Sequence, residues 1–343
     1  MLIVHSDATR DRRTLTELFA GQLVAPFECP ERVDYIIECA RTESIGEIRG
    51  PDEHGLEPVL AIHDADYIDF LRVAWRDWQA AGYQGEAIPN IWPTRRMPGG
   101  PIPRHIEGRL GYYALAGETS LNADTFAAAL LSKDIALTAL DQVLDSGAPA
   151  FALCRPPGHH AARDQYGGYC FINNVAVSAQ RALDRGHRRV AILDIDFHHG
   201  NGTQDIFYER SDVLTLSLHG DPMDEFPYFL GFANETGRGD GEGYNVNYPL
   251  PSGTDYARWA QALDDAIARV RDFAPDMLII ALGVDTFEND PISSFTLQSD
   301  DYLDIGARLK RIGLPTLFVM EGGYAVEEIG VNAINVLKGF DNA

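Results

Sequence analysis

The stretch VAILDIDFHHGNG, residues 190–202, decides the fold, because an apolar run passes in it directly into acids and histidines. Its apolar part, Val190–Leu193, is typical of a strand that is covered on both faces of a parallel sheet. Alternate residues of a strand face the same side, so Asp194, Asp196 and His198 are expected to point together. Carboxylate oxygens and imidazole nitrogens are ligands that Zn²⁺ accepts. The stretch therefore predicts a metal site at the end of a central strand.

Other apolar runs have the same character, and helical patterns alternate with them. Together with Val190–Ile195, the predicted strands are Leu2–Val4, Ala150–Cys154, Val213–Leu218, Met277–Leu282 and Thr316–Met320. The predicted helices are Thr125–Leu144, Asn174–Asp184, Tyr256–Phe273, Asp300–Ile312 and Val326–Leu337. This alternation predicts an α/β fold: a single doubly wound domain over residues 1–343, with a mostly parallel central sheet and helices on both faces. In such a fold the active site lies at the carboxyl ends of the strands.

Polar clusters follow five of these predicted strands. They are Arg155–His160, His198–Asn201, His219–Asp221, Asp285 and Glu321–Tyr324. Parallel strands end at the same edge of a sheet, so these loops are expected to converge there. Scattered surface polarity rarely gives such a pattern, which therefore favours one functional site.

The charge of the chain is strongly acidic. Its 28 Lys and Arg residues face 51 Asp and Glu residues, which gives a formal net charge of −23. Such a balance argues against binding to nucleic acid or to anionic membranes. It suits a cationic partner or substrate, although acidity that only keeps the protein in solution is the more common reason for such a charge.

Cysteine usage and hydropathy indicate a cytoplasmic protein. The four cysteines, Cys29, Cys39, Cys154 and Cys170, show no CxxC spacing, so the sequence suggests neither a zinc finger nor a disulfide framework. The first residues lack a basic region followed by a long apolar stretch, and no apolar run reaches transmembrane length.

Residues 80–122 differ from the rest of the chain. They are rich in Gly, Pro and Arg and show weak periodicity. We expect an ordered insertion rather than a linker, because Trp92, Tyr112 and Tyr113 need burial. Long loops in compact proteins are usually functional or face a partner.

Asp196, His198 and Asp285 form the candidate metal-ligand set. Asp285 follows the run Met277–Leu282, so the three ligands would come from two strand ends and leave a position open for water and substrate. Two carboxylates neutralise a divalent ion and leave its water less acidic than three histidines would, so a separate general base is needed. An isolated Asp-x-His is more often a capping Asp beside a core His, but the companion motifs favour a metal site.

The loop Arg155–His160, RPPGHH, supplies that base. Two prolines and a glycine make the loop rigid, and the pair His159–His160 follows them. Imidazole titrates near neutral pH, so one histidine can act as a base and the other as an electrostatic partner. Asp194 and Asn201 are the candidates that orient the two rings. The simpler readings are a metal-binding pair or a polar surface loop.

The motif Glu321-Gly322-Gly323-Tyr324 follows the last predicted strand. Two glycines allow a sharp turn there. Such a turn can present the Tyr324 hydroxyl to an oxyanion that also touches the metal. Alone the motif is weak, since a packing tyrosine is the better explanation of an isolated Gly-Gly-Tyr.

These pieces together resemble the arginase-fold deacetylases, that is, the histone deacetylases and their bacterial relatives. The matching segments are Arg155–His160, GGYCFINN at residues 167–174, Asp194–Asn201, Leu282–Asp285 and Glu321–Tyr324, in an order and spacing that span nearly all of residues 150–340. Within this family the chain looks closest to the acetylpolyamine amidohydrolases. That likeness rests on Phe27, Ile106–Gly108 with Gly111–Tyr113, His219–Pro222 and the insertion.

The resemblance implies one catalytic Zn²⁺ bound by Asp196, His198 and Asp285; the same ligands accept Fe²⁺. His199 is not expected to be a ligand. A structural monovalent cation, K⁺ or Na⁺, is implied near Asp194, Asp196, His198, Ser217 and Leu218.

The resemblance also assigns the catalytic roles. His160 is implied as the general base and then acid, and His159, paired with Asp194, as its electrostatic partner. Tyr324 would polarise the amide carbonyl. Asn201 would pair with His160 where some histone deacetylases carry Asp, a difference that lowers the expected pKa of His160.

A narrow channel for a thin methylene chain with an acetamide is implied, lined by Gly168, Tyr169, Phe226 and Ile292. Glu107 and Glu118 of the insertion are candidates to pair with distal ammonium groups, although ordinary solvated charge explains them equally well. In this family the insertion meets its copy in a homodimer, which would narrow the entrance to the site.

The expected activity is therefore hydrolysis of N-acetylated polyamines such as acetylputrescine, acetylcadaverine and acetylspermidine. A protein deacetylase acting on acetyllysine shares every catalytic residue and is the main alternative. A ureohydrolase would need a second metal, for which an Asp-x-Asp pair usually stands where this chain has Asp285-Thr286-Phe287. A catalytically silent sensor of acetylated amines is the alternative from another class.

Overall fold

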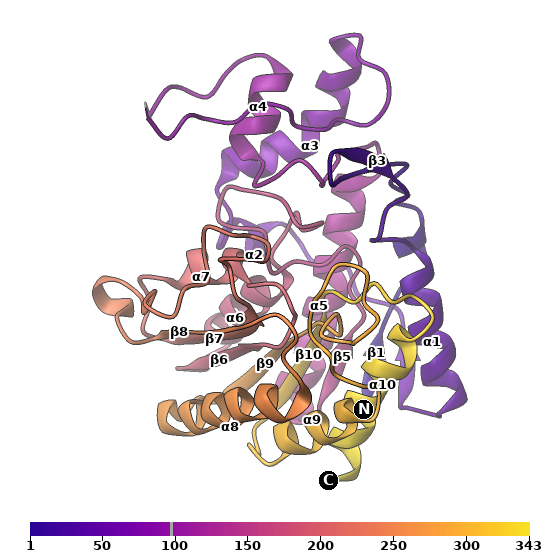
Figure 1. Ribbon diagram of the computed structural model, residues 1–343, viewed down its shortest axis with the longest axis vertical. Coiled ribbons are helices and arrows are strands. Elements are labelled where there is room, and N and C mark those ends of the chain that lie inside the picture. Colours follow the sequence, from indigo (N-terminus) through magenta and orange to yellow (C-terminus); the bar gives the residue numbers. More distant parts are fainter. Residues whose placement is uncertain (97–98) are drawn as a thin grey trace.

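A parallel sheet forms the centre of the molecule (Figure 1). In the computed structural model, which describes residues 1–96 and 99–343, this sheet has eight strands in the order β4-β1-β5-β10-β9-β6-β7-β8. The strands are β1 Leu2–Val4, β4 Glu47–Arg49, β5 Ala150–Ala152, β6 Val190–Asp194, β7 Val213–Gly220, β8 Asn245–Leu250, β9 Met277–Leu282 and β10 Thr316–Met320. The last strand of the sequence, β10, lies between β5 and β9. The predicted α/β fold is confirmed.

All six predicted strands belong to this sheet. The structure adds two strands that the sequence did not indicate, β4 and β8, and both lie at the edges. An edge strand does not need apolar residues on both of its faces. Accordingly, β4 (EIR) and β8 (NVNYPL) mix polar and apolar side chains. β5 ends at Ala152, two residues earlier than predicted, and β6 ends at Asp194.

Helices cover both faces of the sheet. One face carries α2 Glu57–Leu60, α3 Ala65–Ala80, α5 Thr125–Ser146, α6 Asn174–Asp184 and α7 Asn201–Phe207. The other carries α1 Glu31–Thr42, α8 Tyr256–Phe273, α9 Asp301–Lys310 and α10 Ile329–Asn342. The helix α10 begins three residues later than predicted and continues past Leu337 to Asn342.

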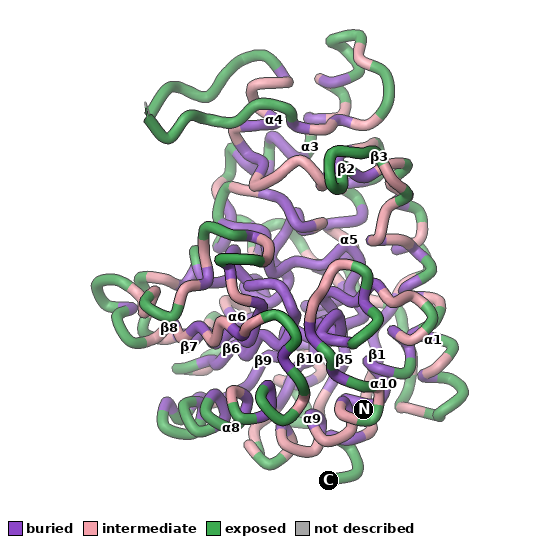
Figure 2. The backbone as a smooth tube through the Cα atoms, viewed as in Figure 1, coloured by how far each residue is buried: buried purple, intermediate pink, exposed green. Residues whose placement is uncertain are grey.

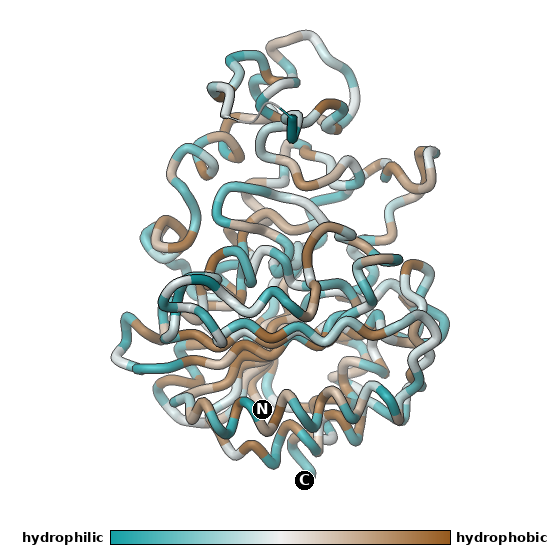
Figure 3. Tube along the Cα trace, turned by 60° about the vertical axis from the view of Figure 1, so that its left-hand side comes forward, coloured by the Kyte–Doolittle hydropathy of each residue, from teal (hydrophilic) through white to brown (hydrophobic). Residues whose placement is uncertain are grey.

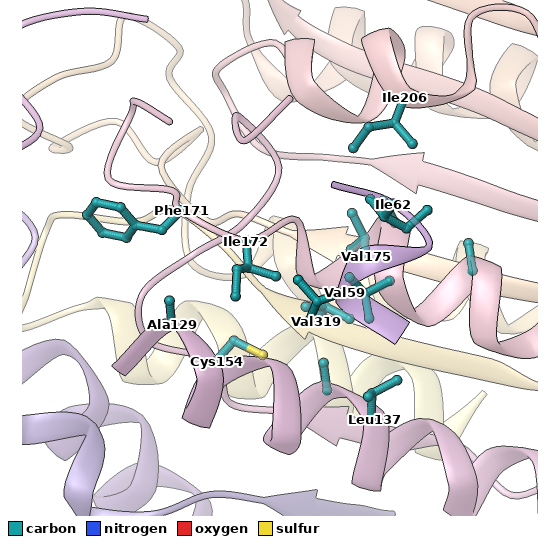
Figure 4. Close-up of a cluster of buried hydrophobic side chains, with 14 of the residues drawn as sticks. Val59, Ile62, Ala129, Leu137, Cys154, Phe171, Ile172, Val175, Ile206 and Val319 are labelled. Atoms are coloured by element: carbon teal, nitrogen blue, oxygen red, sulfur yellow. The ribbon is translucent and has the colours of Figure 1, made fainter. Parts of the chain in front are cut away.

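The alternation of side chains along each strand divides the core in two. Ile192 of β6 lies in one apolar cluster, while its neighbours Ala191 and Leu193 lie in the other. Figure 4 shows part of the first cluster, where Val319 of β10 and Leu137 of α5 come together. In Figure 3 the strands form an apolar band through the middle of the molecule, which is why they lack the alternating pattern of a half-exposed sheet.

Local signals explain several helix ends. The Asn173 side chain accepts a hydrogen bond of 2.9 Å from the backbone N–H of Ala176 and caps α6. The Asp255 side chain caps α8 in the same way, with 3.0 Å to the N–H of Arg258. Gly147 ends α5 with a φ of 70°, a conformation that glycine adopts readily.

The described part of this segment, residues 80–96 and 99–122, carries a helix of its own, α4 Ile106–Tyr113, which lies beside α3 at the top of the view in Figures 1 and 2. Tyr113 is buried and Tyr112 is half-buried, as predicted. The prediction for Trp92 is wrong: its side chain is 40% exposed, although the indole Nε1 donates a hydrogen bond to the carbonyl of Ala114.

A separate hairpin, β2 Glu17–Phe19 and β3 Gln22–Val24, precedes α1. Most of its side chains are exposed, but Glu17 is buried. The sequence did not indicate this hairpin, because three-residue strands with mixed polarity give no periodic signal. In the described part of the chain, no helix is long and apolar enough to span a membrane.

Candidate active site

Asp196, His198 and Asp285 meet where β6 and β9 end. These two strands pair in the sheet, with Asp194 of β6 opposite Ala281 of β9, so the loops that follow them are neighbours. One ligand atom from each of the three side chains lies within 4.8 Å of the others, and all three residues are buried. The Nδ1 atom of His198 is 3.1 Å from Asp285 Oδ2 and 3.4 Å from Asp196 Oδ1. The three residues predicted as metal ligands are therefore brought together.

This donor set fits a divalent cation. Backbone N–H groups fix both carboxylates, since Phe197 donates to Asp285 at 2.7 Å and Gly322 donates to Asp196 at 2.7 Å. Burial and the neighbouring Asp196 carboxylate raise the pKa of Asp285 to about 7. Two carboxylates held this close are stabilised by a cation, and oxygen and imidazole ligands of this kind suit zinc or iron.

The loop after β5 places the histidine pair beside this cluster. His159 Nδ1 lies 2.9 Å from Asp194 Oδ2, and His160 Nδ1 lies 2.7 Å from Asn201 Oδ1. Burial lowers the pKa of His159, but the carboxylates of Asp194 and Asp196 outweigh it and raise that pKa to about 10. Burial, followed by the charge of His159, lowers the pKa of His160 well below its ordinary value. The two adjacent imidazoles are thus prepared for opposite protonation states.

The turn after β10 holds Tyr324. Gly323 has a φ of 129°, so the sharp turn predicted for the double glycine is present. The backbone N–H of Tyr324 donates to Asp290 Oδ2 at 2.6 Å, and its ring lies 4.9 Å from the guanidinium carbon of Arg32. Tyr324, His160 and His198 line the same cavity, so this tyrosine belongs to the site rather than only to the core.

That cavity has a volume of about 530 Å³. Five predicted substrate-binding residues line it: Glu118, Gly168, Tyr169, Phe226 and Ile292. The Phe226 ring lies 5.2 Å from the His160 ring. Gly168 has a φ of 53°, and a Cβ there would stand 2.1 Å from the His160 ring, so only glycine fits.

Glu107 lies elsewhere. It is in the first turn of α4, partly exposed, with its carboxylate 3.7 Å from the His105 ring. The structure does not bring Glu107 to the cavity of its own chain.

Several residues of the site were not found from the sequence. Glu17, Leu18 and Phe19 of β2 line the cavity, as does Glu225. Glu17 Oε1 accepts a 2.6 Å hydrogen bond from the Tyr169 hydroxyl, and burial raises the pKa of Glu17 to about 7. The only possible signal was an acid in a short exposed hairpin, which sequence periodicity cannot distinguish from surface charge.

The cavity is acidic. Glu17, Glu118 and Glu225 contribute carboxylates, and among the described residues that line it there is no Lys or Arg. A cavity of this charge favours a cationic ligand over a neutral or anionic one.

His199 turns away from the three ligands. It is buried, with Nε2 3.1 Å from Gln204 Oε1 and its ring 4.5 Å from that of His219. This agrees with the prediction that His199 is not a ligand. Behind the site, Asp194 and Ser217 stand opposite each other on β6 and β7, followed by Leu218, so the residues predicted for a monovalent cation are neighbours.

The region after Asp285 does not supply a second metal site. Thr286 shares a hydrogen bond of 2.9 Å with the Tyr302 hydroxyl, and Phe287 is buried in the apolar core. A ureohydrolase of this fold would need a carboxylate there, so this alternative loses its support.

Comparison with known proteins assigns the family. The histone deacetylase domain matches residues 26–340. The chain is 53% identical over 344 residues to acetylpolyamine amidohydrolase 1 of Pseudomonas aeruginosa, covering 100% of this chain and 99% of the relative. It is 52% identical to the acetylpolyamine amidohydrolase of Mycoplana ramosa, covering 99% of each.

A solved structure agrees with these relatives. The crystal structure of acetylpolyamine aminohydrolase from Burkholderia pseudomallei is 39% identical and superposes with a TM-score of 0.94 over 99% of this chain and 98% of that one. The matched family, the full-length relatives and the fold agree with the catalytic cluster at the strand ends, and the chain belongs to the histone deacetylase family of hydrolytic deacetylases.

Proposed function

We propose that this chain hydrolyses the acetamide of N-acetylated polyamines, the acetylputrescine, acetylcadaverine and acetylspermidine class, to the free polyamine and acetate. The observation that carries the proposal is the acidic cavity, which has three glutamates and, among its described lining residues, no Lys or Arg, and which reaches His160 and Tyr324. The names of the full-length relatives support the same substrate class.

Asp196, His198 and Asp285 would hold the catalytic ion, which we propose to be zinc; Fe²⁺ suits the same ligands. When bound, the ion polarises the acetyl carbonyl and makes a water molecule more acidic. Three protein ligands leave room for both.

The hydrogen bond between His160 and Asn201 fixes the base. Because Asn201 Oδ1 can only accept, His160 carries its proton on Nδ1 and presents a free lone pair on Nε2. The lowered pKa of His160 keeps this ring neutral near pH 7, so Nε2 can take a proton from the attacking water. The same nitrogen then delivers the proton to the departing amine.

His159 and Tyr324 stabilise the charge that develops. The raised pKa of His159 keeps its ring protonated against Asp194, which places a positive charge beside the reacting atoms. The Tyr324 hydroxyl donates a hydrogen bond to the carbonyl oxygen, which becomes an oxyanion during attack. Both groups are buried, and low exposure to water strengthens these interactions.

A homodimer through the insertion is the second part of the proposal. Ile91, Trp92 and Ile102 are large apolar side chains that the insertion leaves 61%, 40% and 38% exposed, and a second copy would cover them. Glu107 would then act near a neighbouring entrance rather than in its own cavity. We also propose the monovalent cation, K⁺ or Na⁺, at Asp194, Asp196, His198, Ser217 and Leu218, which lie at the ends of adjacent strands. A cytoplasmic location stays a prediction.

A substrate panel tests the proposed function. The zinc-loaded protein is assayed with acetylputrescine, with an acetyllysine peptide and with neutral N-butylacetamide. We expect acetylputrescine to be preferred, because it is the only one of the three that is both small and positively charged, as the acidic cavity requires. Tyr324→Phe is expected to lower kcat by about 10²–10³-fold, as the loss of an oxyanion donor does. Preference for the acetyllysine peptide would instead assign the chain to protein deacetylation.

A further inference from the structure

One buried carboxylate contacts three buried guanidinium groups beside the active site. Arg12, Glu28, Arg32 and Arg155 are each at most 3% exposed. Glu28 Oε1 accepts from Arg155 Nε at 2.7 Å and from Arg32 Nη1 at 3.4 Å. Glu28 Oε2 accepts from Arg155 Nη2 at 3.2 Å and from Arg12 Nη1 at 3.3 Å. Glu28 is thus the shared anion of the cluster.

Two of these arginines belong to the loops that carry the catalytic groups. Arg155 opens the RPPGHH loop, which ends in His159 and His160. Arg32 donates from Nε to the carbonyl of Gly323 at 2.7 Å and from Nη2 to the carbonyl of Glu321 at 2.6 Å. Glu28 therefore connects the histidine loop with the turn of Tyr324, although these segments lie far apart in the sequence.

The remaining donors of the cluster tie it to the surrounding backbone. Arg155 Nη1 donates to the carbonyls of Thr9 and Arg12, the latter at 3.0 Å, and Arg12 Nη2 donates to the carbonyl of Ser120 at 3.3 Å. Through these hydrogen bonds, the segment before the β2–β3 hairpin and the C-terminal end of the insertion are both linked to the Glu28 cluster. Glu28 itself is not among the residues that line the active-site cavity.

Removal of the Glu28 carboxylate would leave three buried cations without their common anion. Such cations are not tolerated in place and have to move or find new partners. Arg32 cannot move without releasing the carbonyls of Glu321 and Gly323, and Arg155 cannot move without disturbing the loop that follows it. Either movement changes the distance between Tyr324 and the histidine pair.

We propose that Glu28 is a positioning residue for the hydrolysis: by holding Arg32 and Arg155 together, it sets where Tyr324 stands relative to His159 and His160. This inference rests on the proposed function, because it concerns the rate of that reaction. It assigns to a residue outside the cavity a role in kcat rather than in substrate binding.

The test is a double-mutant cycle on the zinc-loaded full chain. Glu28→Gln keeps the shape of the side chain but offers one oxygen in place of a shared anion. With acetylputrescine we expect kcat to fall on the order of 10²-fold, as small misplacements of catalytic groups do, with KM unchanged. In the Tyr324→Phe background, Glu28→Gln is expected to lower kcat by a much smaller factor, because the hydroxyl that it would misplace is already absent.

A second readout keeps the cycle measurable when Tyr324→Phe is nearly inactive. The affinity of a trifluoromethyl ketone analogue of acetylputrescine, whose hydrate mimics the tetrahedral geometry, is measured by calorimetry in all four proteins. Glu28→Gln should weaken the binding of this analogue only in the proteins that retain Tyr324. If Glu28→Gln does not fold, Arg155→Lys carries the test, since lysine keeps the charge but loses the two-pronged contact with Glu28.

Asp134→Asn is the matched control. Asp134 is the carboxylate partner of the buried Lys133, at 2.5 Å, and accepts a hydrogen bond of 2.9 Å from the backbone N–H of His54. Neither partner belongs to the histidine loop or to the turn of Tyr324, so loss of the carboxylate should lower stability without changing kcat. Equal fold losses from Glu28→Gln in both Tyr324 backgrounds, or the same kcat loss in Asp134→Asn, would overturn the proposal. Failure of the proposed function is a different result, in which the unmodified zinc-loaded chain hydrolyses no acetylpolyamine.

Discussion

Glu17 gives the cavity a carboxylate that titrates near neutral pH. Burial raises its pKa to about 7, and the 2.6 Å hydrogen bond from Tyr169 is not strong enough to reverse this. The ionised fraction of Glu17 therefore grows as the pH rises through 7. A cationic substrate should be captured better above this pH than below it.

We accordingly expect kcat/KM for acetylputrescine to rise between pH 6 and pH 8 in part through Glu17, whose pKa is about 7. Glu17→Gln should flatten that part of the pH profile. Neutral N-butylacetamide is the control, since its profile should be the same in both proteins. A Glu17-dependent rise with the neutral substrate as well would show that Glu17 acts on the chemistry and not on the charge of the ligand.

The raised pKa of Glu17 also makes the stability of the folded chain depend on pH. The folded chain holds a proton on Glu17 up to a pH of about 7, whereas the unfolded chain releases it near the ordinary glutamate pKa of 4.5. The folded state therefore binds more protons in this interval, so the contribution of Glu17 to stability falls as the pH rises through it. Binding of a cation in the cavity would offset this loss.

Some residues of the site could be predicted from the sequence, and others could not. Asp196, His198 and Asp285 could be predicted because each follows an apolar run that ends a strand at the same edge of the sheet. Glu28 and Glu17 gave no such signal. Their partners, Arg155 and Tyr169, lie 127 and 152 residues away, and one acid in a polar segment has no pattern that points to so distant a contact.

At the scale of elements, α4 packs on the segment before it without room for a methyl group. A Cβ added to Gly111 would stand 1.5 Å from the carbonyl oxygen of Ile91. Alanine normally stabilises a helix interior by about 1 kcal/mol relative to glycine. The contact with backbone reverses the sign here, because a carbonyl cannot rotate away as a flexible side chain can.

Gly111→Ala is therefore expected to lower the thermal unfolding midpoint and to open residues 80–122 to limited proteolysis. Gly50→Ala serves as the control, since its added Cβ would meet no atom within 4 Å. An unchanged midpoint and an unchanged cleavage pattern in Gly111→Ala would contradict the close packing between α4 and Ile91.

Elements were predictable where burial is complete. The six central and near-central strands have apolar residues on both faces, and α6, α8 and β9 begin and end at the predicted residues. The edge strands β4 and β8 and the hairpin β2–β3 escaped prediction because solvent on one side permits any residue there. Trp92 was expected to be buried for its size alone, but exposure is set by what neighbours it, which composition does not reveal.

At the scale of the whole molecule, the exposed apolar residues of the insertion predict a dimer of twice 37.8 kDa. Ile91→Glu should shift the protein to the monomer in sedimentation velocity experiments, because Ile91 is 61% exposed and a charge there would be buried between two copies. Val331→Glu on α10 is the control, since Val331 is an apolar residue 45% exposed on a different element. A monomeric unmodified chain, or an Ile91→Glu dimer, would exclude this interface.

The place of β10 in the sheet has a consequence for synthesis on the ribosome. The strand that completes the centre of the sheet, between β5 and β9, is the last to be translated. Until residues 316–320 emerge, the nascent chain presents two open strand edges where its core should be. A product truncated before this strand would lack Tyr324 and would leave the edges of β5 and β9 unpaired. Premature termination therefore yields aggregation-prone chains rather than partly active enzyme.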